Sequence, residues 1–520
     1  MLIDDQSALI AALSRPDAFG LKASVPVTVK ETNISGVFMA GDRVYKLKRG
    51  VKYPYVDYST LEKRRAACQK EMDICERFAP GLCFGVEDVV LDRKGRYFVR
   101  SACSDNGAEV VDCVLVMHRF EENMLFDNMV DRGDLDRFEM MDTAEKIFEL
   151  HKNARVVTDR NPVDIIRGRV YENNAMIRCF VPAIFDAEDV DALEKEQLDA
   201  LETNRELLQK RQADGKIREC HGDLTLRNLA MWNGKVTPFN PIEFYADLTQ
   251  IDTLYDFAFL VVDLESKGQR RLESILFNHY MAMSADWDGI PVLPLYLSCR
   301  AAVNAYVFAQ RSAEIKDRHE SALMANRAYE QLVIARRFLE RPKPVLVACG
   351  GLSGSGKSRI GRESAPFIGN PPGAVILRDD VLRKNMLHAD LEDYIDTANY
   401  TPETESEVFG VLCDECRKVL RAGQPVVADA LFHDPKQRIA IETLAREEGV
   451  AFKGLWVDAP LDVRIERVAS RKRNPSDVKS ADELRRQLDI DVGSVTWDKI
   501  DTSGDRMATL TRVRTLLAGL

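Results

Sequence analysis

A glycine-rich segment in the last third of the chain constrains the fold more than any other feature of the sequence. It reads GGLSGSGKS and fits the pattern G-x-x-x-x-G-K-[ST] at every fixed position from Gly351 to Ser358. An apolar run, residues 345–349, comes directly before it, and the segment after it is typical of a helix start. Glycines in such a loop let backbone N–H groups surround phosphate oxygens, and the helix N-terminus adds the positive end of its dipole. The segment therefore predicts a phosphate-binding loop between a strand and a helix.

The residues of this loop have expected roles in holding a nucleotide. Lys357 should reach the β- and γ-phosphates, and Ser358 should hold Mg²⁺. ATP and Mg²⁺ are therefore the cofactors that the loop implies. The residues predicted to bind ATP here are Gly351, Leu352, Ser353, Gly354, Ser355, Gly356, Lys357 and Ser358.

The C-terminal part of the chain alternates short apolar runs with longer amphipathic segments. The runs predicted to be buried strands are residues 344–350, 374–378, 425–430 and 452–459. Strands that alternate with helical segments favour an α/β fold, in which helices cover both faces of a parallel sheet.

Acidic residues lie at the expected carboxyl ends of these strands, where open α/β sheets bind their ligands. Asp380 follows the second predicted strand, and Asp429 ends the third. Asp380 can accept the proton of an attacking hydroxyl, and Asp429 can belong to the Mg²⁺ shell or contact the substrate. The arginines expected to hold an anionic substrate or to close over the phosphates are Arg383, Arg464, Arg467 and Arg471.

Residues 344–500 resemble the small P-loop kinases, which include polynucleotide kinase, gluconate kinase and chloramphenicol phosphotransferase. The resemblance rests on GLSGSGKS, RDDVLRK, VVADA and the spaced arginines. It implies that Asp380 activates the acceptor hydroxyl and that Arg467 and Arg471 belong to a mobile lid. It does not specify the acceptor.

A second segment with residues suited to phosphoryl transfer, HGDLTLRN, lies at residues 221–228. In a kinase catalytic loop with this spacing, the Asp accepts the acceptor's proton and the Asn binds Mg²⁺. Asp223 and Asn228 are the corresponding residues. The segment that follows predicts a β-hairpin with an Asn-Gly turn, and its second strand leads to Glu243, a further expected metal ligand.

Residues 25–340 resemble the aminoglycoside phosphotransferase-like family. The loop of that family reads HGD-L-x-x-x-N, and an acidic residue in an I-D-F-like strand follows it. The resemblance implies that Asp223 is the catalytic base and that Asn228 and Glu243 bind the metal.

The chain departs from the family pattern in two places. Glu243 stands where Asp is usual, and Asp247 is the alternative ligand. The segment that should form a glycine-rich loop over the phosphates contains Gly36 as its single glycine. Asp252 and Asp256 are expected to anchor the catalytic loop.

A kinase-like domain also needs a lysine on a strand and a glutamate on a helix. Lys46 and Lys48 share one face of a predicted strand, and Lys46 is the preferred candidate. Glu71 lies in a helical pattern and is its expected partner. Met117 lies in the segment expected to contact adenine. The three preferred residues complete the predicted ATP site of this domain.

These patterns divide the chain into two domains. Residues 1–343 predict an α+β bilobal protein-kinase-like domain, with antiparallel hairpins first and helices dominating after residue 135. Residues 344–520 predict an α/β P-loop NTPase domain. The boundary follows a long helical pattern that ends at Arg341-Pro342.

The composition limits the possible partners and compartment. The net charge of -11 disfavours indiscriminate binding to nucleic acid or to an anionic membrane. Acidic residues near the N-terminus disfavour a signal peptide, and no apolar run approaches the ~20 residues that span a bilayer. The 11 scattered cysteines, including the pair Cys413 and Cys416, fit a reducing cytoplasm. We therefore expect a cytoplasmic protein.

The leading interpretation is a kinase that uses ATP and Mg²⁺ at two nucleotide sites and transfers phosphate to the hydroxyl of a small molecule. In the first alternative, the N-terminal domain is regulatory and only the P-loop domain turns over ATP. In the second, the acceptor is the 5′-hydroxyl of a nucleic acid end. Antibiotic phosphorylation is compatible with the first-domain resemblance, but the sequence does not identify the acceptor or the oligomeric state.

Overall fold

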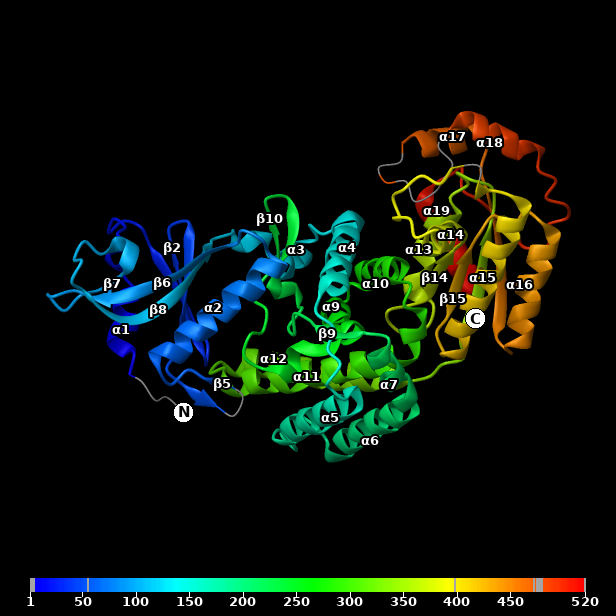
Figure 1. Ribbon diagram of the computed structural model, residues 1–520. Coiled ribbons are helices and arrows are strands. Elements are labelled where there is room, and N and C mark those ends of the chain that lie inside the picture. Colours follow the sequence, from blue (N-terminus) through cyan, green and yellow to red (C-terminus); the bar gives the residue numbers. More distant parts are fainter. Residues whose placement is uncertain (1–4, 54–55, 397–398, 471–472, 474–479, 519–520) are drawn as a thin grey trace. The chain divides into compact units, whose positions relative to one another are not determined.

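The C-terminal sheet has five parallel strands in the order β14-β15-β13-β16-β17 (Figure 1). This computed structural model describes residues 5–53, 56–396, 399–470, 473 and 480–518. Four strands confirm the predicted parallel sheet, whereas β17 was missed because its short sequence, DKID, contains no apolar run. The strands are β13 (Val345–Gly350), β14 (Val375–Arg378), β15 (Val426–Asp429), β16 (Ala451–Asp458) and β17 (Asp498–Asp501).

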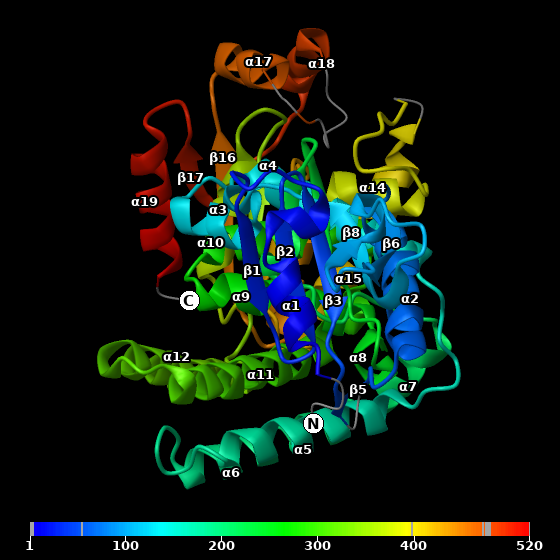
Figure 2. The same ribbon diagram turned by 90° about the vertical axis from the view of Figure 1, so that its left-hand side faces the viewer.

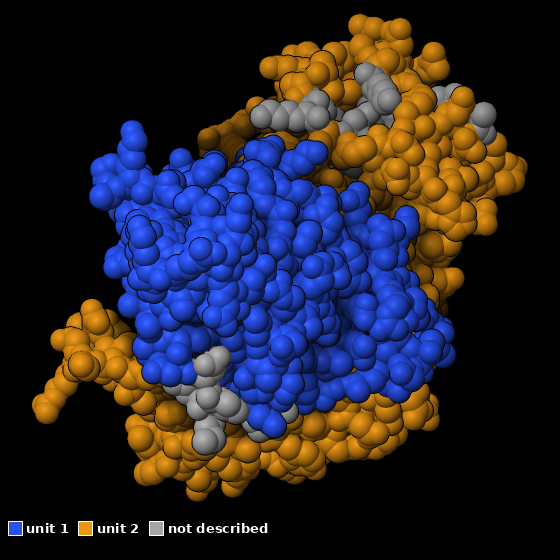
Figure 3. All heavy atoms as spheres, turned by 60° about the vertical axis from the view of Figure 1, so that its left-hand side comes forward, with its two compact units in different colours: residues 1–136, 149–160, 212–259 blue, residues 137–148, 161–211, 260–520 orange. Residues whose placement is uncertain are grey.

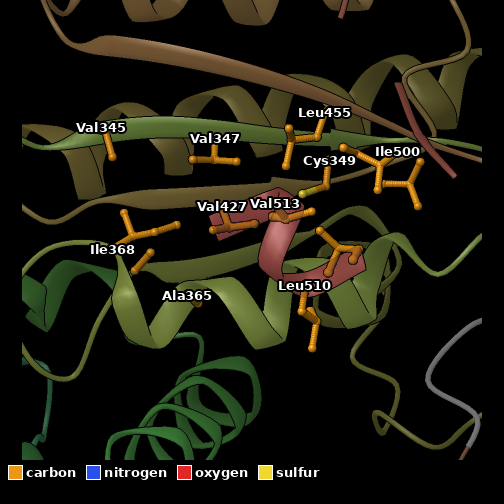
Figure 4. Close-up of a cluster of buried hydrophobic side chains, with 13 residues drawn as sticks. Val345, Val347, Cys349, Ala365, Ile368, Val427, Leu455, Ile500, Leu510 and Val513 are labelled. Carbon is orange, nitrogen blue, oxygen red and sulfur yellow. The ribbon is translucent and has the colours of Figure 1, made fainter. Parts of the chain in front are cut away.

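Helices cover both faces of this sheet, as the alternating sequence pattern predicts. Helices α13 (Lys357–Ser364) and α19 (Arg506–Leu517) lie on one face, and α15 (Pro402–Arg421) and α16 (Pro435–Glu447) lie on the other. Figure 4 shows apolar side chains from the strands packed against α13 and α19. This buried layer fixes the strand ends from which the phosphate loop and the acidic residues project. The shorter helices are α14 (Asp379–Met386), α17 (Leu461–Ala469) and α18 (Ala481–Arg486).

The N-terminal sheet has six antiparallel strands in the order β1-β2-β3-β8-β6-β7, and Figure 2 shows β1, β2 and β3 side by side. The antiparallel hairpins predicted for this part are present as β2–β3 and β6–β7. Helix α2 (Leu61–Phe78) packs against β8 and β6. The strands are β1 (Val27–Glu31), β2 (Ser35–Ala40), β3 (Arg43–Lys48), β6 (Cys83–Leu91), β7 (Tyr97–Val99) and β8 (Glu109–His118).

The HGD segment is followed by the predicted hairpin, formed by β10 (Leu229–Trp232) and β11 (Lys235–Pro238). Its turn residues Asn233 and Gly234 both have positive φ values, 51° and 72°. This is the backbone that a two-residue Asn-Gly turn favours. Strand β11 ends at Pro238, so Glu243 lies in the loop beyond the strand. A second pair, β9 (Ile217–Glu219) and β12 (Gln250–Asp252), flanks this region.

Helices dominate between residue 126 and the C-terminal sheet, as the sequence predicts. The order of the elements confirms a protein-kinase-like fold for the N-terminal part, in which an antiparallel sheet, a catalytic loop with its hairpin, and a helical region follow one another. The helices are α3 (Phe126–Arg132), α4 (Arg137–Asn153), α5 (Pro162–Arg178), α6 (Ala187–Thr203), α7 (Arg205–Ala213), α8 (Ala246–Thr249), α9 (Thr253–Ser266), α10 (Arg270–Ser284), α11 (Leu293–Glu314) and α12 (Arg318–Leu339). Small elements near the N-terminus are α1 (Ser7–Leu13), β4 (Lys52–Tyr53) and β5 (Val56–Asp57).

Residue contacts group the chain into two compact units, coloured separately in Figure 3. Unit 1 contains residues 1–136, 149–160 and 212–259, and therefore both the antiparallel sheet and the HGD segment. Unit 2 contains the remaining helices and the whole C-terminal sheet. This grouping differs from the division expected at residue 343, which stays a prediction. The chain does pass from helix α12 to strand β13 at that place.

One segment of the described chain, Trp287–Glu314, is long and apolar enough to cross a membrane, with a mean hydropathy of 1.3 over its most apolar window. Arg300 interrupts the apolar residues of this segment, so the sequence alone did not predict a membrane-spanning length. In the structure 72% of the window is buried within the protein. Such burial is typical of a core helix.

Candidate functional site

The phosphate loop adopts a backbone that only glycine tolerates at several positions. Gly351 has a φ of +145°, and a Cβ added there would lie 2.1 Å from the carbonyl oxygen of Val457. Gly354 and Gly356 have φ values of +80° and +102°. Side chains at these positions would clash or strain the backbone. Helix α13 begins at Lys357, so its first N–H groups lack acceptors within the helix and suit phosphate oxygens.

Two residues that lie far along the chain hold this loop in place. The side chain of Gln487 accepts a hydrogen bond from the Ser353 N–H and donates one to the Ser353 hydroxyl, both at 3.0 Å. Arg464 is 2% exposed and donates to the Ser353 carbonyl oxygen at 2.8 Å and to Gln487 at 3.1 Å. Arg464 therefore supports the loop from within the protein, a different place from the lid position that we expected. Gln487 carried no signal in the sequence.

The other arginines expected at the lid or substrate have different surroundings. Arg467 donates to Thr502 Oγ1 at 2.9 Å and to carbonyl oxygens of the phosphate loop. Arg383 is buried, pairs with Glu405 at 2.7 Å, and does not line the cavity that contains Lys357. Arg471 lies outside the described residues.

Three aspartates line the same cavity as Lys357, namely Asp379, Asp380 and Asp429. Asp380 accepts two hydrogen bonds from Arg378, at 3.0 and 2.6 Å. Burial and the neighbouring Asp380 raise the pKa of the Asp379 carboxyl to about 7, against the opposing charge of Lys357. A carboxyl with this pKa is suited to accept a proton near neutral pH. Asp380 was predicted from the sequence and Asp379 was not, although the two aspartates are adjacent in the chain.

Asp429 has the surroundings expected of a metal-binding carboxylate. It ends strand β15, is 2% exposed, and accepts no hydrogen bond of normal geometry from the described residues. Burial raises the pKa of Asp429, while Lys357, Arg378 and the nearby Ser358 hydroxyl lower it. A buried carboxylate without hydrogen-bond partners, beside a hydroxyl and a phosphate loop, fits Mg²⁺, which favours oxygen ligands. The residues present therefore fit the expected ion.

The cavity around these residues has a volume of about 580 Å³ and a strongly cationic wall. Burial and the nearby guanidinium groups of Arg137 and Arg378 lower the pKa of Arg362 to about 10. Positive charge concentrated in this way, next to carboxylates at the strand ends, can hold a polyphosphate beside a proton acceptor. The arginines that line the cavity are Arg137, Arg359, Arg362, Arg378, Arg467 and Arg473.

The expected lysine–glutamate pair is present in unit 1, and it involves both candidate lysines. Glu71 is 2% exposed and accepts Lys46 and Lys48, each at 2.5 Å. Although burial acts in the opposite direction, the two lysines hold the pKa of Glu71 well below its usual range. Lys46, Glu71 and Met117 line one cavity of about 340 Å³, whose walls include the apolar side chains of Val44 and Phe239.

The catalytic-loop residues also lie together. The Asn228 amide donates at 2.8 Å to both the main-chain and a side-chain oxygen of Asp223. The Asp256 carboxylate accepts the N–H groups of His221 at 3.1 Å and Gly222 at 2.9 Å. Asp256 thus holds the loop as expected. Asp252 instead accepts the N–H of Leu254 at the start of helix α9.

The surroundings of Glu243 differ from those expected of a carboxylate that binds a metal ion. It is 5% exposed, and its Oε1 accepts the Tyr58 hydroxyl at 2.8 Å and the Lys48 ammonium. Asn240 instead lines the cavity, accepts Lys46 Nζ at 2.9 Å, and donates to Asn228 Oδ1 at 3.3 Å. The side chain beside Asn228 and Lys46 is therefore a carboxamide that the sequence analysis missed. The alternative ligand, Asp247, pairs with Arg160.

Comparisons with known proteins found one family model and several relatives that are similar to this chain. An AAA domain family model matches residues 345–489. An uncharacterized protein of Mycobacterium tuberculosis (strain ATCC 25618 / H37Rv) is 27% identical over 490 residues, which cover 92% of this chain and 93% of that protein.

Solved structures are similar to separate parts of the chain. A choline/ethanolamine kinase family protein from Mesorhizobium loti covers 61% of this chain and 90% of its own, with a TM-score of 0.36 and 13% identity. A gluconokinase from Sinorhizobium meliloti 1021 covers 35% of this chain and 94% of its own, with a TM-score of 0.25 and 19% identity. The C-terminal part is thus similar to the AAA domain family, in agreement with its phosphate loop between β13 and α13.

Proposed function

We propose that this protein is an ATP- and Mg²⁺-dependent phosphotransferase that moves the γ-phosphate to a hydroxyl group of a small molecule at its P-loop site. The observation that carries the proposal is the buried Asp429 carboxylate, which lies without hydrogen-bond partners among the described residues and has Lys357 and Ser358 around it. This arrangement supports a site for a metal-bound triphosphate.

The residues of the chain supply positioning, charge and a proton acceptor. The phosphate loop and Lys357 would hold the β- and γ-phosphates, and the cavity arginines would neutralise their charge. Ser358 and Asp429 would hold Mg²⁺, which supplies further neutralisation of the phosphate oxygens when bound. The acceptor oxygen forms a bond to the γ-phosphorus and gives its proton to an aspartate, while the bond from that phosphorus to the bridging oxygen of ADP breaks.

Two aspartates are candidates for the proton acceptor. Asp380 was the residue selected from sequence, but both oxygens of its carboxylate already accept hydrogen bonds from Arg378. The pKa of Asp379 is raised to about 7 by its burial and by Asp380. We propose Asp379 as the proton acceptor, with Asp380 as the residue that helps to tune it.

A second nucleotide site, in the cavity of unit 1, is part of this proposal. It is supported by the pair formed by Lys46 and Glu71 and by the position of Met117 in the same cavity. Transfer by Asp223 at this site was the leading interpretation from sequence. The contacts of Glu243 with Lys48 and Tyr58 favour the alternative, in which this unit is regulatory and only the P-loop domain turns over ATP.

The acceptor class follows from the charge and size of the P-loop site. A cavity of about 580 Å³ suits a nucleotide with a small hydroxyl compound. The net charge of -11 disfavours a nucleic acid end as the acceptor. The free cysteines fit a protein that works in the cytoplasm.

The test is a screen with ATP labelled at the γ-phosphate. Sugars, nucleosides, aminoglycosides and RNA ends are offered as acceptors to the wild-type chain and to Lys357→Ala. We expect transfer to at least one small hydroxyl compound, lost in Lys357→Ala and dependent on Mg²⁺. Transfer that persists in Lys357→Ala would contradict the assignment to the P-loop site.

A further inference from the structure

The cavity of unit 1 lacks a carboxylate where a kinase needs one for its metal. We propose that this site holds a nucleotide without a divalent cation, because the carboxamide of Asn240 stands at the position that should bind the metal. The inference rests on the proposed second nucleotide site. It states that the ligand of that site is a nucleotide without bound metal, and that the site binds this nucleotide without transferring phosphate.

The position of Asn240 follows from its contacts. In kinases the Asn of the catalytic loop and an acidic residue after it hold the metal between them. Here Asn240 follows strand β11, has a left-handed backbone with φ of 59°, and lines the same cavity as Lys46. Its Oδ1 accepts Lys46 Nζ at 2.9 Å, and its Nδ2 donates to Asn228 Oδ1 at 3.3 Å. Asn240 therefore lies between the lysine and the catalytic-loop asparagine.

The direction of these hydrogen bonds disfavours a cation beside Asn228. An N–H group of Asn240 faces the Asn228 Oδ1 atom, the oxygen that a metal would need. The NH₂ group of the same Asn228 side chain donates to Asp223 Oδ2 at 2.8 Å. Turning the Asn240 amide over would place its NH₂ group against the Lys46 ammonium and its oxygen against an oxygen. The observed orientation instead pairs the Lys46 ammonium with an acceptor and the Asn228 oxygen with a donor.

The nearby acidic residues cannot replace the missing carboxylate. Glu243 is 5% exposed, and its Oε1 accepts both Lys48 and Tyr58. Its charge is thus compensated by a lysine of the chain itself. Asp247 pairs with Arg160. Glu71 is likewise compensated by lysines of the chain, since it accepts both Lys46 and Lys48.

The remaining lining suits the base and sugar of a nucleotide. The cavity measures about 340 Å³, which lies within the range of small-ligand sites. Val37, Val44, Met117 and Phe239 supply apolar wall, and the Lys46 ammonium supplies positive charge at one end. Binding of this kind needs the lysine and the apolar walls, whereas transfer would need the metal that Asn240 disfavours. The site is therefore built to sense nucleotide rather than to consume it.

The test measures nucleotide binding to the full chain by calorimetry, with Lys357→Ala present throughout to weaken the P-loop site. ATP and AMP are titrated in Mg²⁺ and in EDTA. We expect AMP to bind with the same Kd, within about twofold, in both conditions, and ATP to bind no more tightly in Mg²⁺ than in EDTA, because Mg²⁺ withdraws free ATP into its complex. In the additional variant Asn240→Asp, a second oxygen ligand faces Asn228, and Mg²⁺ should strengthen ATP binding by about tenfold.

A further variant shows which site produces the binding signal. Met117→Arg in the Lys357→Ala background should fill the cavity and remove the signal, which assigns that signal to unit 1. Binding that Mg²⁺ strengthens tenfold with Asn240 in place would overturn this inference and leave the second nucleotide site standing. If neither nucleotide binds, or if Met117→Arg leaves the signal unchanged, both the inference and the second site fail, while transfer at the P-loop site is unaffected. The wild-type comparison stands even if Asn240→Asp does not fold.

Discussion

Asp429 and Glu243 are both buried carboxylates that follow a strand near a candidate nucleotide site, yet their surroundings are opposite. Asp429 accepts no hydrogen bond of normal geometry from the described residues. Glu243 accepts a hydroxyl and an ammonium group from Tyr58 and Lys48. A buried negative charge requires compensation. Among the described residues, the nearest guanidinium to Asp429, that of Arg378, lies 3.9 Å away, so a bound cation can add to the compensation there. Glu243 already accepts a lysine and a hydroxyl of the chain, and we expect this contrast to separate a metal site from a structural one.

The strongest way to break this comparison is to remove the expected metal-binding carboxylate of the P-loop site and the expected base of unit 1 in turn. Asp429→Asn should lower total ATP turnover by about 10²- to 10³-fold, because it removes a negative charge from the expected Mg²⁺ ligands. Asp223→Asn, the matched change in unit 1, should leave turnover within about twofold if, as we propose, that unit binds nucleotide without transferring phosphate. Phosphate transfer from labelled ATP measures both.

A large loss in Asp223→Asn alone would reverse the roles of the two sites. Circular dichroism and thermal melting of each variant show whether the fold is retained. Nucleotide binding in the Lys357→Ala background should persist in Asp223→Asn, which separates a lost site from a lost reaction.

The second prediction uses the pKa of Asp379, raised to about 7. The ionised carboxylate accepts the proton, so turnover should rise about tenfold between pH 6 and pH 8. Asp379→Asn should lower turnover by about 10²-fold or more and flatten this profile. Asp380→Asn is the control and should keep a rise with pH, shifted to lower pH, because the proton acceptor is still present but loses a charge that raises its pKa. If Asp380→Asn alone removes the pH dependence, the sequence-based choice of Asp380 is restored.

The same pKa also predicts the effect of pH on stability. The unfolded Asp379 loses its proton near its ordinary pKa, before the folded one does. The folded state therefore binds more protons between that pKa and about 7, and its stability falls as pH rises through this window. Asn resembles the protonated form, so Asp379→Asn should be more stable than wild type at pH 8. The difference should shrink at acidic pH, as thermal melting can show.

The third prediction tests the structural role of Glu243. Glu243→Ala leaves the Lys48 ammonium and the Tyr58 hydroxyl without this partner, and should destabilise unit 1 by about 3 kcal/mol. Tyr58→Phe removes only one hydrogen bond and should cost about 1 kcal/mol. Hydrogen exchange of strand β3 and helix α2 reports this locally. Unchanged exchange together with a loss of turnover in Glu243→Ala would identify Glu243 as a metal ligand after all.

Local patterns explain what could be predicted from the sequence. The phosphate loop is fixed by glycines at set spacings, and its neighbouring strand and helix follow from a short apolar run and a helical pattern. The hairpin after the HGD segment follows from its Asn-Gly turn, whose φ values of 51° and 72° are those the turn type requires. Each of these features depends on residues that are adjacent in the chain.

What the sequence could not predict depends on where a side chain points after a strand ends. Asn240 and Glu243 are three residues apart, and acidity alone favoured Glu243. The left-handed φ of 59° at Asn240 directs that residue to Lys46 and Asn228. Likewise, an arginine in an amphipathic helix is predicted to be exposed. Arg464 is instead 2% exposed, because it donates to a carbonyl oxygen of the phosphate loop, which is distant in the sequence. Long-range polar contacts of this kind leave no periodic signal.

The smallest expected effect concerns Gln487, the long-range support of the phosphate loop. Its side chain accepts hydrogen bonds from the Ser353 N–H and from Arg464, and donates one to the Ser353 hydroxyl. Gln487→Ala should raise the KM for ATP about fivefold with little change in kcat, since a net hydrogen bond is worth about 1 kcal/mol. Gln487→Glu keeps an acceptor for both the Ser353 N–H and Arg464, and should recover most of the lost affinity. If the two variants behave alike, the loop is held by its own glycine backbone, and the preorganised P-loop site would need no distant support.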